Sequence, residues 1–137
     1  NCMSVYIIII SGTFVITCIV IDDDKNIVKV FSELLELMGL EVLAQGYDGN
    51  DAISLYTKYR PEVIFTDIMM PHADGFYGIT KIKEFDPKAK IVAVTADISS
   101  ETEQRLNELN ITAIIYKPFT PNEIKQVLMQ EYKINTQ

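Results

Sequence analysis

Cysteine and histidine are scarce in this 137-residue sequence, and their scarcity excludes several kinds of site. The two cysteines, Cys2 and Cys18, are too few for a disulfide framework, and no Cys-X-X-Cys pair or Cys/His cluster indicates a metal site. The single histidine, His72, has no partner at a spacing typical of catalysis, so a solvated loop residue is the simpler interpretation. We therefore expect both cysteines to be reduced, with Cys18 a small core residue.

Positive charge and glycine are also in short supply. The sequence has 12 lysines and arginines against 19 aspartates and glutamates, which gives a formal net charge of −7. Domains that bind nucleic acid through bulk electrostatics are usually basic, so we expect no nucleic-acid partner. The six glycines form no glycine-rich phosphate loop after the first predicted strand, which argues against a cofactor-binding flavodoxin-like protein.

One long stretch lacks charge altogether. Residues 4–21 carry no charged side chain, and a run of this length reaches the range of a transmembrane helix. Isoleucine, valine and threonine dominate the stretch, which favours strands, and a Ser-Gly-Thr segment interrupts it as a turn would. We therefore expect no membrane span and a cytoplasmic protein. We divide the chain into an N-terminal apolar extension over 1–16, one domain over 17–133 and a C-terminal tail over 134–137.

Short apolar runs alternate with amphipathic stretches from residue 17 onward. Runs rich in β-branched residues predict strands over 17–21, 41–44, 63–66, 91–94 and 111–116. Apolar residues at helical spacing predict helices over 27–38, 51–59, 76–85, 100–109 and 121–132. A strand followed by a helix, five times over, indicates an α/β fold of the flavodoxin-like (βα)5 type. This is a doubly wound, parallel, five-stranded sheet with strand order 2-1-3-4-5.

Capping residues indicate where the helices begin. Asn50 or Asp51 is expected to start the second helix. Ser100 with Glu103 fits a capping box for the fourth helix, and Thr120 is expected to start the fifth. The apolar positions of the first helix, which we expect to face the core, are Ile27, Val30, Phe31, Leu34, Leu37 and Met38.

Polar side chains with related chemistry follow the carboxyl ends of the strands, where ligands bind in open parallel sheets. Asp22 and Asp23 follow the first strand, Asp67 the third, Thr95 the fourth and Lys117 the fifth. Clustered carboxylates are hard oxygen ligands suited to Mg²⁺, and a carboxylate beside such a metal can act as a nucleophile that forms an acyl phosphate. An ammonium group and a hydroxyl could neutralise and hydrogen-bond the phosphoryl oxygens. The pattern therefore predicts a phosphoryl-transfer site.

Simpler interpretations account for these residues only one at a time. Acids at the start of a helix stabilise it by about 0.3–1 kcal/mol each, which explains Asp24 well but not three consecutive aspartates. Asp67 alone could be a turn former, Thr95 a loop residue and Lys117 a solvated charge. Their joint position at one edge of the predicted sheet favours a functional site.

Four segments, in this order, resemble the receiver domain of two-component response regulators, in its stand-alone form: IVIDDD, VIFTDIMMPHADG, IVAVTA and YKPF. The resemblance covers about residues 17–133. It implies that Asp67 is the phosphorylated aspartate, and that Asp22 and Asp23 hold Mg²⁺ together with it. The backbone carbonyl of Met69 would complete the metal site, and Gly75 matches a glycine in the loop after the phosphorylation site.

The same resemblance gives roles to the remaining strand ends. Thr95 matches the switch hydroxyl and Lys117 the lysine that contacts the phosphate, with a cis peptide bond expected before Pro118. The family often has a rotating tyrosine or phenylalanine three residues before this lysine, where the present sequence has Ile114. The sequence departs from the family pattern at this point, and we count Ile114 and the neighbouring Tyr116 with Thr95 as switch residues.

By this resemblance, the chain would accept a phosphoryl group on Asp67 from a histidine kinase or histidine phosphotransferase in a Mg²⁺-dependent reaction. Phosphorylation would alter the surface of the helix over 100–109, the strand over 111–116 and the helix over 121–132, which would contact a downstream protein. Such a protein is a signalling phosphoacceptor and not an enzyme, since it catalyses only its own phosphorylation and dephosphorylation. The alternatives are a receiver-like interaction module that takes no phosphate and a receiver fragment of a hybrid histidine kinase.

The extension over 1–16 is not required by the family. With strand order 2-1-3-4-5 the first strand is central, so a hairpin partner would find no free edge beside it. The extension would then lengthen that strand, pack elsewhere or add to the sheet edge of another molecule. We favour an intermolecular or dimer contact.

Overall fold

The computed structural model describes residues 15–132, and this part of the chain folds into alternating strands and helices. The strands are β1 (Thr17–Ile21), β2 (Glu41–Gly46), β3 (Val63–Thr66), β4 (Ile91–Thr95) and β5 (Ala113–Tyr116). The helices are α2 (Lys25–Leu37), α3 (Gly49–Tyr59), α4 (Gly75–Phe85), α5 (Ser100–Glu108) and α6 (Pro121–Tyr132). The strands form one sheet in the order β2-β1-β3-β4-β5, and all neighbouring pairs are parallel. The predicted flavodoxin-like (βα)5 fold is confirmed.

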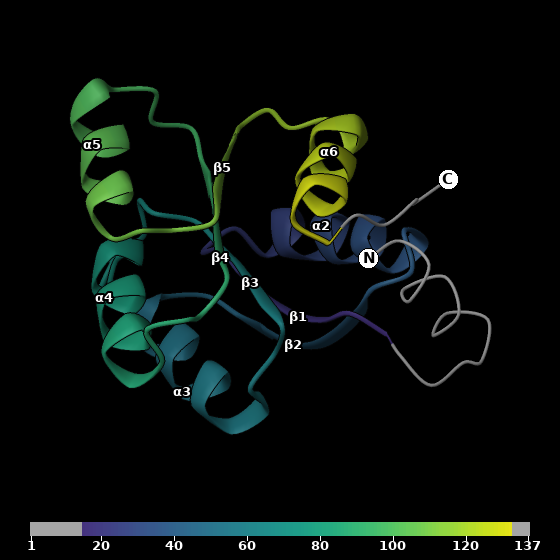
Figure 1. The fold of residues 1–137 in the computed structure, drawn as a ribbon, viewed down its shortest axis with the longest axis horizontal. Helices are drawn as coiled ribbons and strands as arrows, with labels where there is room; N and C mark the ends of the chain where they lie inside the picture. The colour runs from purple at the N-terminus through teal and green to yellow at the C-terminus, as the bar shows by residue number, and fades with distance from the viewer. Residues whose placement is uncertain (1–14, 133–137) are drawn as a thin grey trace.

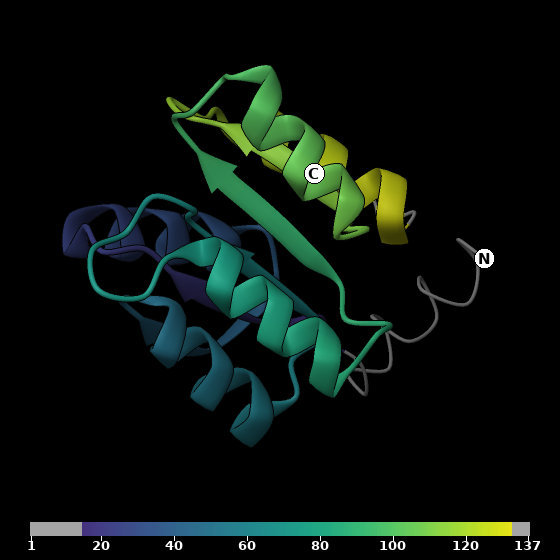
Figure 2. The same ribbon diagram turned by 90° about the vertical axis from the view of Figure 1, so that its left-hand side faces the viewer.

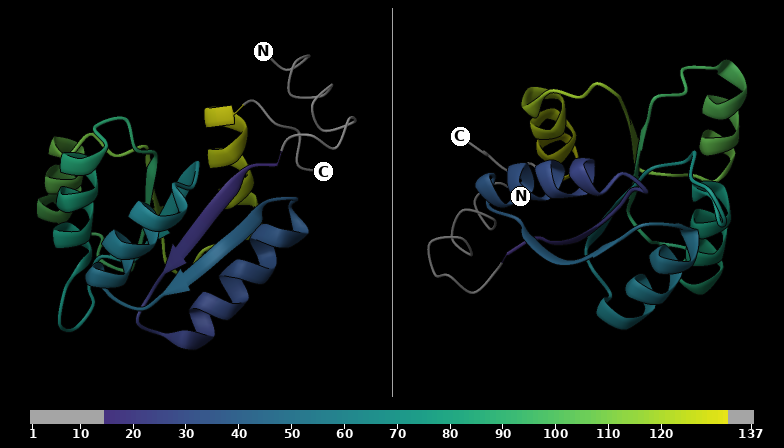
Figure 3. Two further views of the ribbon diagram at one scale, coloured as in Figure 1. Left: turned by 90° about the horizontal axis from the view of Figure 1, so that it is seen from below. Right: turned by 180° about the vertical axis from the view of Figure 1, so that it is seen from behind.

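Helices cover both faces of the sheet. Helices α3, α4 and α5 lie on one face, and α2 and α6 lie on the other (Figure 1). Figure 2, viewed from the side of α3, α4 and α5, shows these three helices in front of the sheet. In Figure 3, β1 and β2 run side by side in the same direction. All strands therefore end at the same edge of the sheet, which brings their following residues together.

The sheet has a buried centre and partly exposed edges. Every residue of β3 and β4 is buried, whereas most residues of β2 and β5 are partly exposed. One apolar cluster lies on each face, and in the cluster beneath α2 the rings of Phe31 and Phe65 are 5.2 Å apart. Cys18 in β1 is fully buried, and this burial raises the pKa of its thiol to about 12. The thiol is therefore a protonated core group, as expected.

The residue before β1 is part of the folded region. Ile16 is buried, and its carbonyl accepts a hydrogen bond from the Glu41 N–H at 2.9 Å. Of the apolar extension predicted over 1–16, only the last two residues are among those described, so the dimer contact assigned to it lies outside the described residues. The tail predicted over 134–137 lies outside them too. Within residues 15–132, no helix has both the length and the apolar character that crossing a membrane requires.

The buried face of α2 differs from the predicted one. Val30 is 50% exposed and Leu37 is 84% exposed, whereas Val28 and Leu35 are buried. The buried face also contains Ser32, whose hydroxyl accepts a hydrogen bond from the Gln45 side chain at 2.8 Å. The prediction counted apolar residues only and therefore omitted Ser32. As a result, it placed part of the buried face on the solvent-exposed side of the helix. A buried serine is tolerated because its hydroxyl has a hydrogen-bond partner.

Two predicted helix starts are wrong by one to three residues. The side chain of Asp48 caps α3, rather than Asn50 or Asp51. The side chain of Ser99 caps α5, rather than Ser100. In both segments adjacent residues have similar capping preferences, so the path of the chain after the preceding strand decides which of them caps the helix.

Other element boundaries lie within two residues of their predicted positions. The Glu123 N–H donates to the Thr120 hydroxyl at 3.3 Å, so the predicted start of α6 is confirmed. Strand β2 continues two residues beyond its predicted end, to Gly46, and β5 begins two residues later than predicted, at Ala113. The peptide bond between Lys117 and Pro118 is cis, as the resemblance implied.

Candidate functional site

The site lies at the carboxyl edge of the sheet, where β1 and β3 end side by side. The Asp67 N–H donates to the Ile21 carbonyl at 2.8 Å, and the Asp22 N–H donates to the Gly46 carbonyl at 3.1 Å. The parallel hydrogen-bond ladder therefore continues one residue past each strand. This continuation fixes the backbone of both aspartates and directs them to the same edge.

Three carboxylates meet at this edge. Oxygens of Asp22, Asp23 and Asp67 lie within 4.8 Å of one another. Asp22 is 3% exposed and Asp67 is 5% exposed, while Asp23 is open to solvent. Two unit charges 4 Å apart repel by about 1 kcal/mol in water and by about 4 kcal/mol at an effective dielectric of roughly 20. The cluster is therefore a set of hard oxygen donors with unbalanced negative charge, which fits a divalent cation such as Mg²⁺.

Lys117 partly balances this charge. Its ammonium donates a hydrogen bond to Asp22 Oδ2 at 2.6 Å and lies 3.4 Å from Asp67 Oδ2. Burial alone would lower the pKa of Lys117, but the hydrogen bond to Asp22 and the charges of Asp67 and Asp22 outweigh it and raise this pKa. The side chain is 16% exposed, so the ammonium stays charged between two buried carboxylates.

Asp67 has the most perturbed carboxyl group of the site. Burial, with a further contribution from the Asp22 charge, raises the pKa of Asp67 to about 6. The Lys117 ammonium and the Ile68 N–H, which donates to Asp67 Oδ1 at 2.7 Å, limit this rise. At neutral pH the group is a carboxylate held in an unfavourable environment. Such a carboxylate is stabilised by a nearby cation, which favours its charged form.

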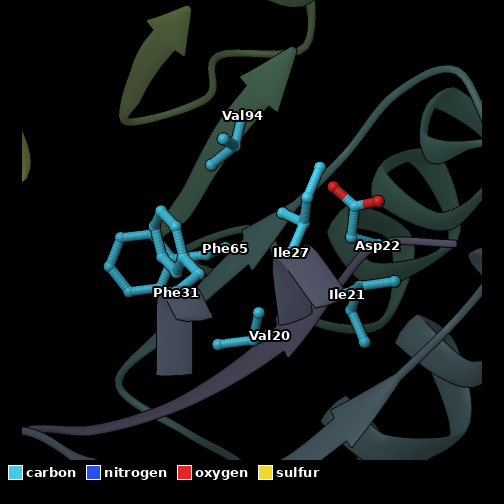
Figure 4. A pocket seen from close by; sticks show the side chains of 7 residues that line it. All are labelled: Val20, Ile21, Asp22, Ile27, Phe31, Phe65 and Val94. Carbon is cyan, nitrogen blue, oxygen red and sulfur yellow. The ribbon is translucent and has the colours of Figure 1, made fainter. Parts of the chain in front are cut away.

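The Asp22 carboxylate borders a small apolar pocket. Figure 4 shows this pocket, which is lined by Asp22 together with aliphatic and aromatic side chains. Its volume is about 10 Å³, which leaves room for no more than a single water molecule. The apolar lining keeps the local dielectric low, which strengthens the charge interactions beside it. The lining residues are Val20, Ile21, Asp22, Ile27, Phe31, Phe65 and Val94.

The loop after Asp67 is fixed by a glycine. The Gly75 N–H donates to the Ile68 carbonyl at 2.8 Å. A Cβ atom at Gly75 would lie 2.2 Å from the Asp67 carbonyl oxygen and 2.6 Å from the Ile68 Cα. Only glycine leaves room for this approach, so Gly75 determines where the loop and the Asp67 backbone lie. Met69 is on the same loop and is 64% exposed.

Thr95 ends β4 and is fully buried. Its carbonyl accepts a hydrogen bond from the Lys117 N–H at 2.8 Å, which ties the ends of β4 and β5 together. Its hydroxyl accepts one from the Asp97 N–H at 3.1 Å. The structure thus brings four sequence-predicted residues, Asp22, Asp23, Asp67 and Lys117, into one cluster and holds Thr95 on the adjoining strand.

The two other expected switch residues lie on β5. Ile114 is partly buried and packs against the apolar cluster beneath α3, α4 and α5. Tyr116 is partly exposed, and its hydroxyl donates to Glu103 on α5 at 3.3 Å. The Tyr116 side chain is therefore hydrogen-bonded to α5 at the surface.

Sequence reasoning missed the hydrogen bonds that follow Thr95. The Asp97 carboxylate accepts hydrogen bonds from the Ser99 N–H at 2.9 Å and from the Thr102 hydroxyl at 2.6 Å. The only signal in the sequence was the capping preference of serine and threonine near the start of a helix.

His72 lies on an exposed loop, as expected.

Comparison with known proteins agrees with this geometry. The family model described as "Response regulator receiver domain" matches residues 18–129. Protein CcdB of Bacillus subtilis is 32% identical over 110 residues, which cover 80% of this chain and 92% of that protein. The probable transcriptional regulator ycf27 of Porphyridium aerugineum is 31% identical over 109 residues, 78% of this chain.

Several relatives are longer than this chain. The matched region spans 44% of the Porphyridium aerugineum regulator. Among solved structures, the CheX-CheY-BeF3-Mg complex of Borrelia burgdorferi has a chain that superimposes with a TM-score of 0.84 at 21% identity, covering 90% of this chain and 93% of that one. At this identity the likeness shows the fold alone. The fold, the edge at which the acids meet and the match over residues 18–129 together establish that this chain belongs to the response regulator receiver domain family of two-component systems.

Proposed function

We propose that this chain accepts a phosphoryl group on Asp67 from a phosphohistidine of a histidine kinase or histidine phosphotransferase, in a Mg²⁺-dependent reaction in the cytoplasm. The observation that carries the proposal is the buried Asp67 carboxylate, which lies 3.4 Å from the Lys117 ammonium and within 4.8 Å of two further acids. The chain is then a signalling phosphoacceptor that promotes only its own phosphorylation and dephosphorylation.

The carboxylate of Asp67 is the nucleophile in this proposal. Asp67 Oδ1 is held by the Ile68 N–H, which orients the group, and Oδ2, 3.4 Å from the Lys117 ammonium, is the atom proposed to attack phosphorus. The new P–O bond forms as the P–N bond of the phosphohistidine breaks, and the imidazole nitrogen keeps the electron pair of that bond. Lys117 and the Thr95 hydroxyl are proposed to contact the phosphoryl oxygens, where charge accumulates during transfer.

Mg²⁺ is proposed to bind at the acidic cluster through Asp22, Asp23 and Asp67, with the backbone carbonyl of Met69 as a further ligand. The donor set supports this, since every side-chain ligand is a carboxylate and one ammonium cannot balance three negative charges. When bound, the metal would neutralise charge on the phosphoryl oxygens.

Phosphorylation is proposed to switch the surface formed by α5, β5 and α6, which would contact a downstream protein. Thr95, Ile114 and Tyr116 are the switch residues in this proposal. Support comes from the connections at the site: Thr95 is bonded to Lys117 and Asp97, and Tyr116 is bonded to Glu103 of α5. A change at the Thr95 hydroxyl therefore has a direct route to the first turn of α5.

Acetyl phosphate provides a donor that needs no partner protein. In the presence of Mg²⁺ we expect the intact mass of the protein to increase by one HPO₃ group. With EDTA in place of Mg²⁺, we expect no increase, because the acidic cluster would repel the donor. A protein whose mass stays unchanged in Mg²⁺ would be a receiver-like interaction module and not a phosphoacceptor.

A further inference from the structure

A chain of hydrogen bonds leads from the Thr95 hydroxyl to the first turn of α5. The Asp97 N–H donates to Thr95 Oγ1 at 3.1 Å. The Asp97 carboxylate in turn accepts from the Thr102 hydroxyl, through Oδ2 at 2.6 Å, and from the Ser99 N–H, through Oδ1 at 2.9 Å. Thr102 is 7% exposed and lies in the first turn of α5. A loop of only four residues, 96–99, separates β4 from this helix.

These bonds leave the Thr95 proton available. A hydroxyl has one proton to donate and two lone pairs to accept with. The Asp97 N–H uses one lone pair, and within the described part of the chain no acceptor takes the Thr95 proton. Thr95 is fully buried, so a donor without a partner is costly unless a ligand completes it. An incoming phosphoryl oxygen would supply the missing acceptor.

The hydrogen bond from the Asp97 N–H can orient the Thr95 hydroxyl only if the loop that carries Asp97 has a fixed position. Both oxygens of its carboxylate are bonded to α5 or to the residue that caps it. The hydrogen bond from Thr102, followed by those from Ser99, lowers the pKa of Asp97, so its carboxylate stays ionised at neutral pH and the bonds persist. The Thr102 hydroxyl therefore anchors the loop segment whose N–H orients Thr95.

Resting on the proposed function, we propose that Thr102 is a positioning residue for phosphoryl transfer. Acting through Asp97, it presents the Thr95 hydroxyl, with its proton free, to the phosphoryl group on Asp67. Thr102 touches neither the phosphoryl group nor the metal. The competing role is purely structural: Thr102 would stabilise the start of α5 and have no effect through Thr95.

Two variants of Thr102 separate these roles. Thr102→Val keeps the β-branched shape but removes the hydroxyl, and Thr102→Ser keeps the hydroxyl. With acetyl phosphate and Mg²⁺, we expect phosphorylation of the valine variant to be about three- to tenfold slower, as loss of one orienting hydrogen bond implies. The serine variant is expected to react at close to the wild-type rate. Amide hydrogen exchange at Asp97 is expected to be faster in the valine variant and unchanged in the serine variant.

A Thr95→Ala background tests whether Thr102 acts through Thr95. In that background we expect Thr102→Val to cause no further slowing, because the hydroxyl that it positions is gone. Equal slowing in both backgrounds would show a structural role and overturn the inference, as would a wild-type rate for Thr102→Val alone. A wild-type protein that gains no HPO₃ would overturn the proposed function and this inference together. A wild type that reacts normally beside an unaffected valine variant would overturn the inference only.

Discussion

Replacing Lys117 with methionine is expected to destabilise the protein strongly in the absence of divalent cations. The ammonium lies 2.6 Å from Asp22 Oδ2 and 3.4 Å from Asp67 Oδ2, and both carboxylates are buried. Removing one partner of a buried ion pair leaves uncompensated charge, and we expect the free energy of unfolding to fall by about 3–5 kcal/mol. Urea denaturation at pH 7.5 in EDTA measures this change.

Mg²⁺ and a second substitution provide the controls for this prediction. A cation that binds only the folded protein raises the free energy of unfolding, and the increase grows with the logarithm of the cation concentration once this exceeds Kd. Mg²⁺ should therefore stabilise both Lys117→Met and wild type. Adding Asp22→Asn to the methionine variant removes one unpaired charge and should restore part of the loss in EDTA. The exposed Lys88 gives the matched control, Lys88→Met. Equal stability of the two single variants would show that the Lys117 ion pairs contribute little.

The second large effect is expected at Gly75. In Gly75→Ala the new Cβ would meet the Asp67 carbonyl oxygen at 2.2 Å and the Ile68 Cα at 2.6 Å, and backbone atoms cannot move aside as a side chain can. We expect the loop to shift and the free energy of unfolding to fall by about 1–3 kcal/mol, the usual cost of overpacking. Because the shift includes the backbone of Asp67, the stabilisation by Mg²⁺ should also weaken. Thermal unfolding with and without Mg²⁺ measures both effects.

Gly78, one turn later in α4, is the matched control for Gly75. A Cβ there would lie 3.3 Å from the Ala52 Cβ and from the Cα and carbonyl oxygen of Gly49, so a shift of only a few tenths of an ångström is needed. Alanine in a helix interior is favoured over glycine by roughly 0.5–1 kcal/mol, which offsets this adjustment. Gly78→Ala should therefore be close to wild type in stability and in its response to Mg²⁺. If Gly75→Ala behaves the same way, the loop does not depend on close backbone approach.

The fold and the outline of the site followed from the sequence because each depends on a repeated pattern. Alternating strands and helices predicted the parallel sheet, and the parallel sheet predicted that the residues after its strands would meet at one edge. Asp22, Asp67 and Lys117 lie together for this reason, although 95 positions separate the first from the last. Hydropathy patterns and a general rule on strand ends were sufficient for that step.

Individual side-chain partners could not be predicted in the same way. Nothing in the sequence indicates that the Lys117 ammonium lies closer to Asp22 than to Asp67, because the choice depends on how β1, β3 and β5 are spaced in the folded sheet. Ser32 faces the core because of its bond to Gln45 on a neighbouring element, which no helical periodicity reveals. Such contacts depend on tertiary packing and not on local propensity.

The identity of the phosphorylated residue is the central claim, and mapping the modification tests it directly. Wild type and Asp67→Asn would be treated with acetyl phosphate and Mg²⁺, reduced with borohydride to trap an acyl phosphate, and digested for peptide mass analysis. We predict that the trapped product appears only in the wild-type protein, on the peptide that contains Asp67. A trapped product on another peptide, or an unchanged gain of HPO₃ in Asp67→Asn, would contradict the assignment.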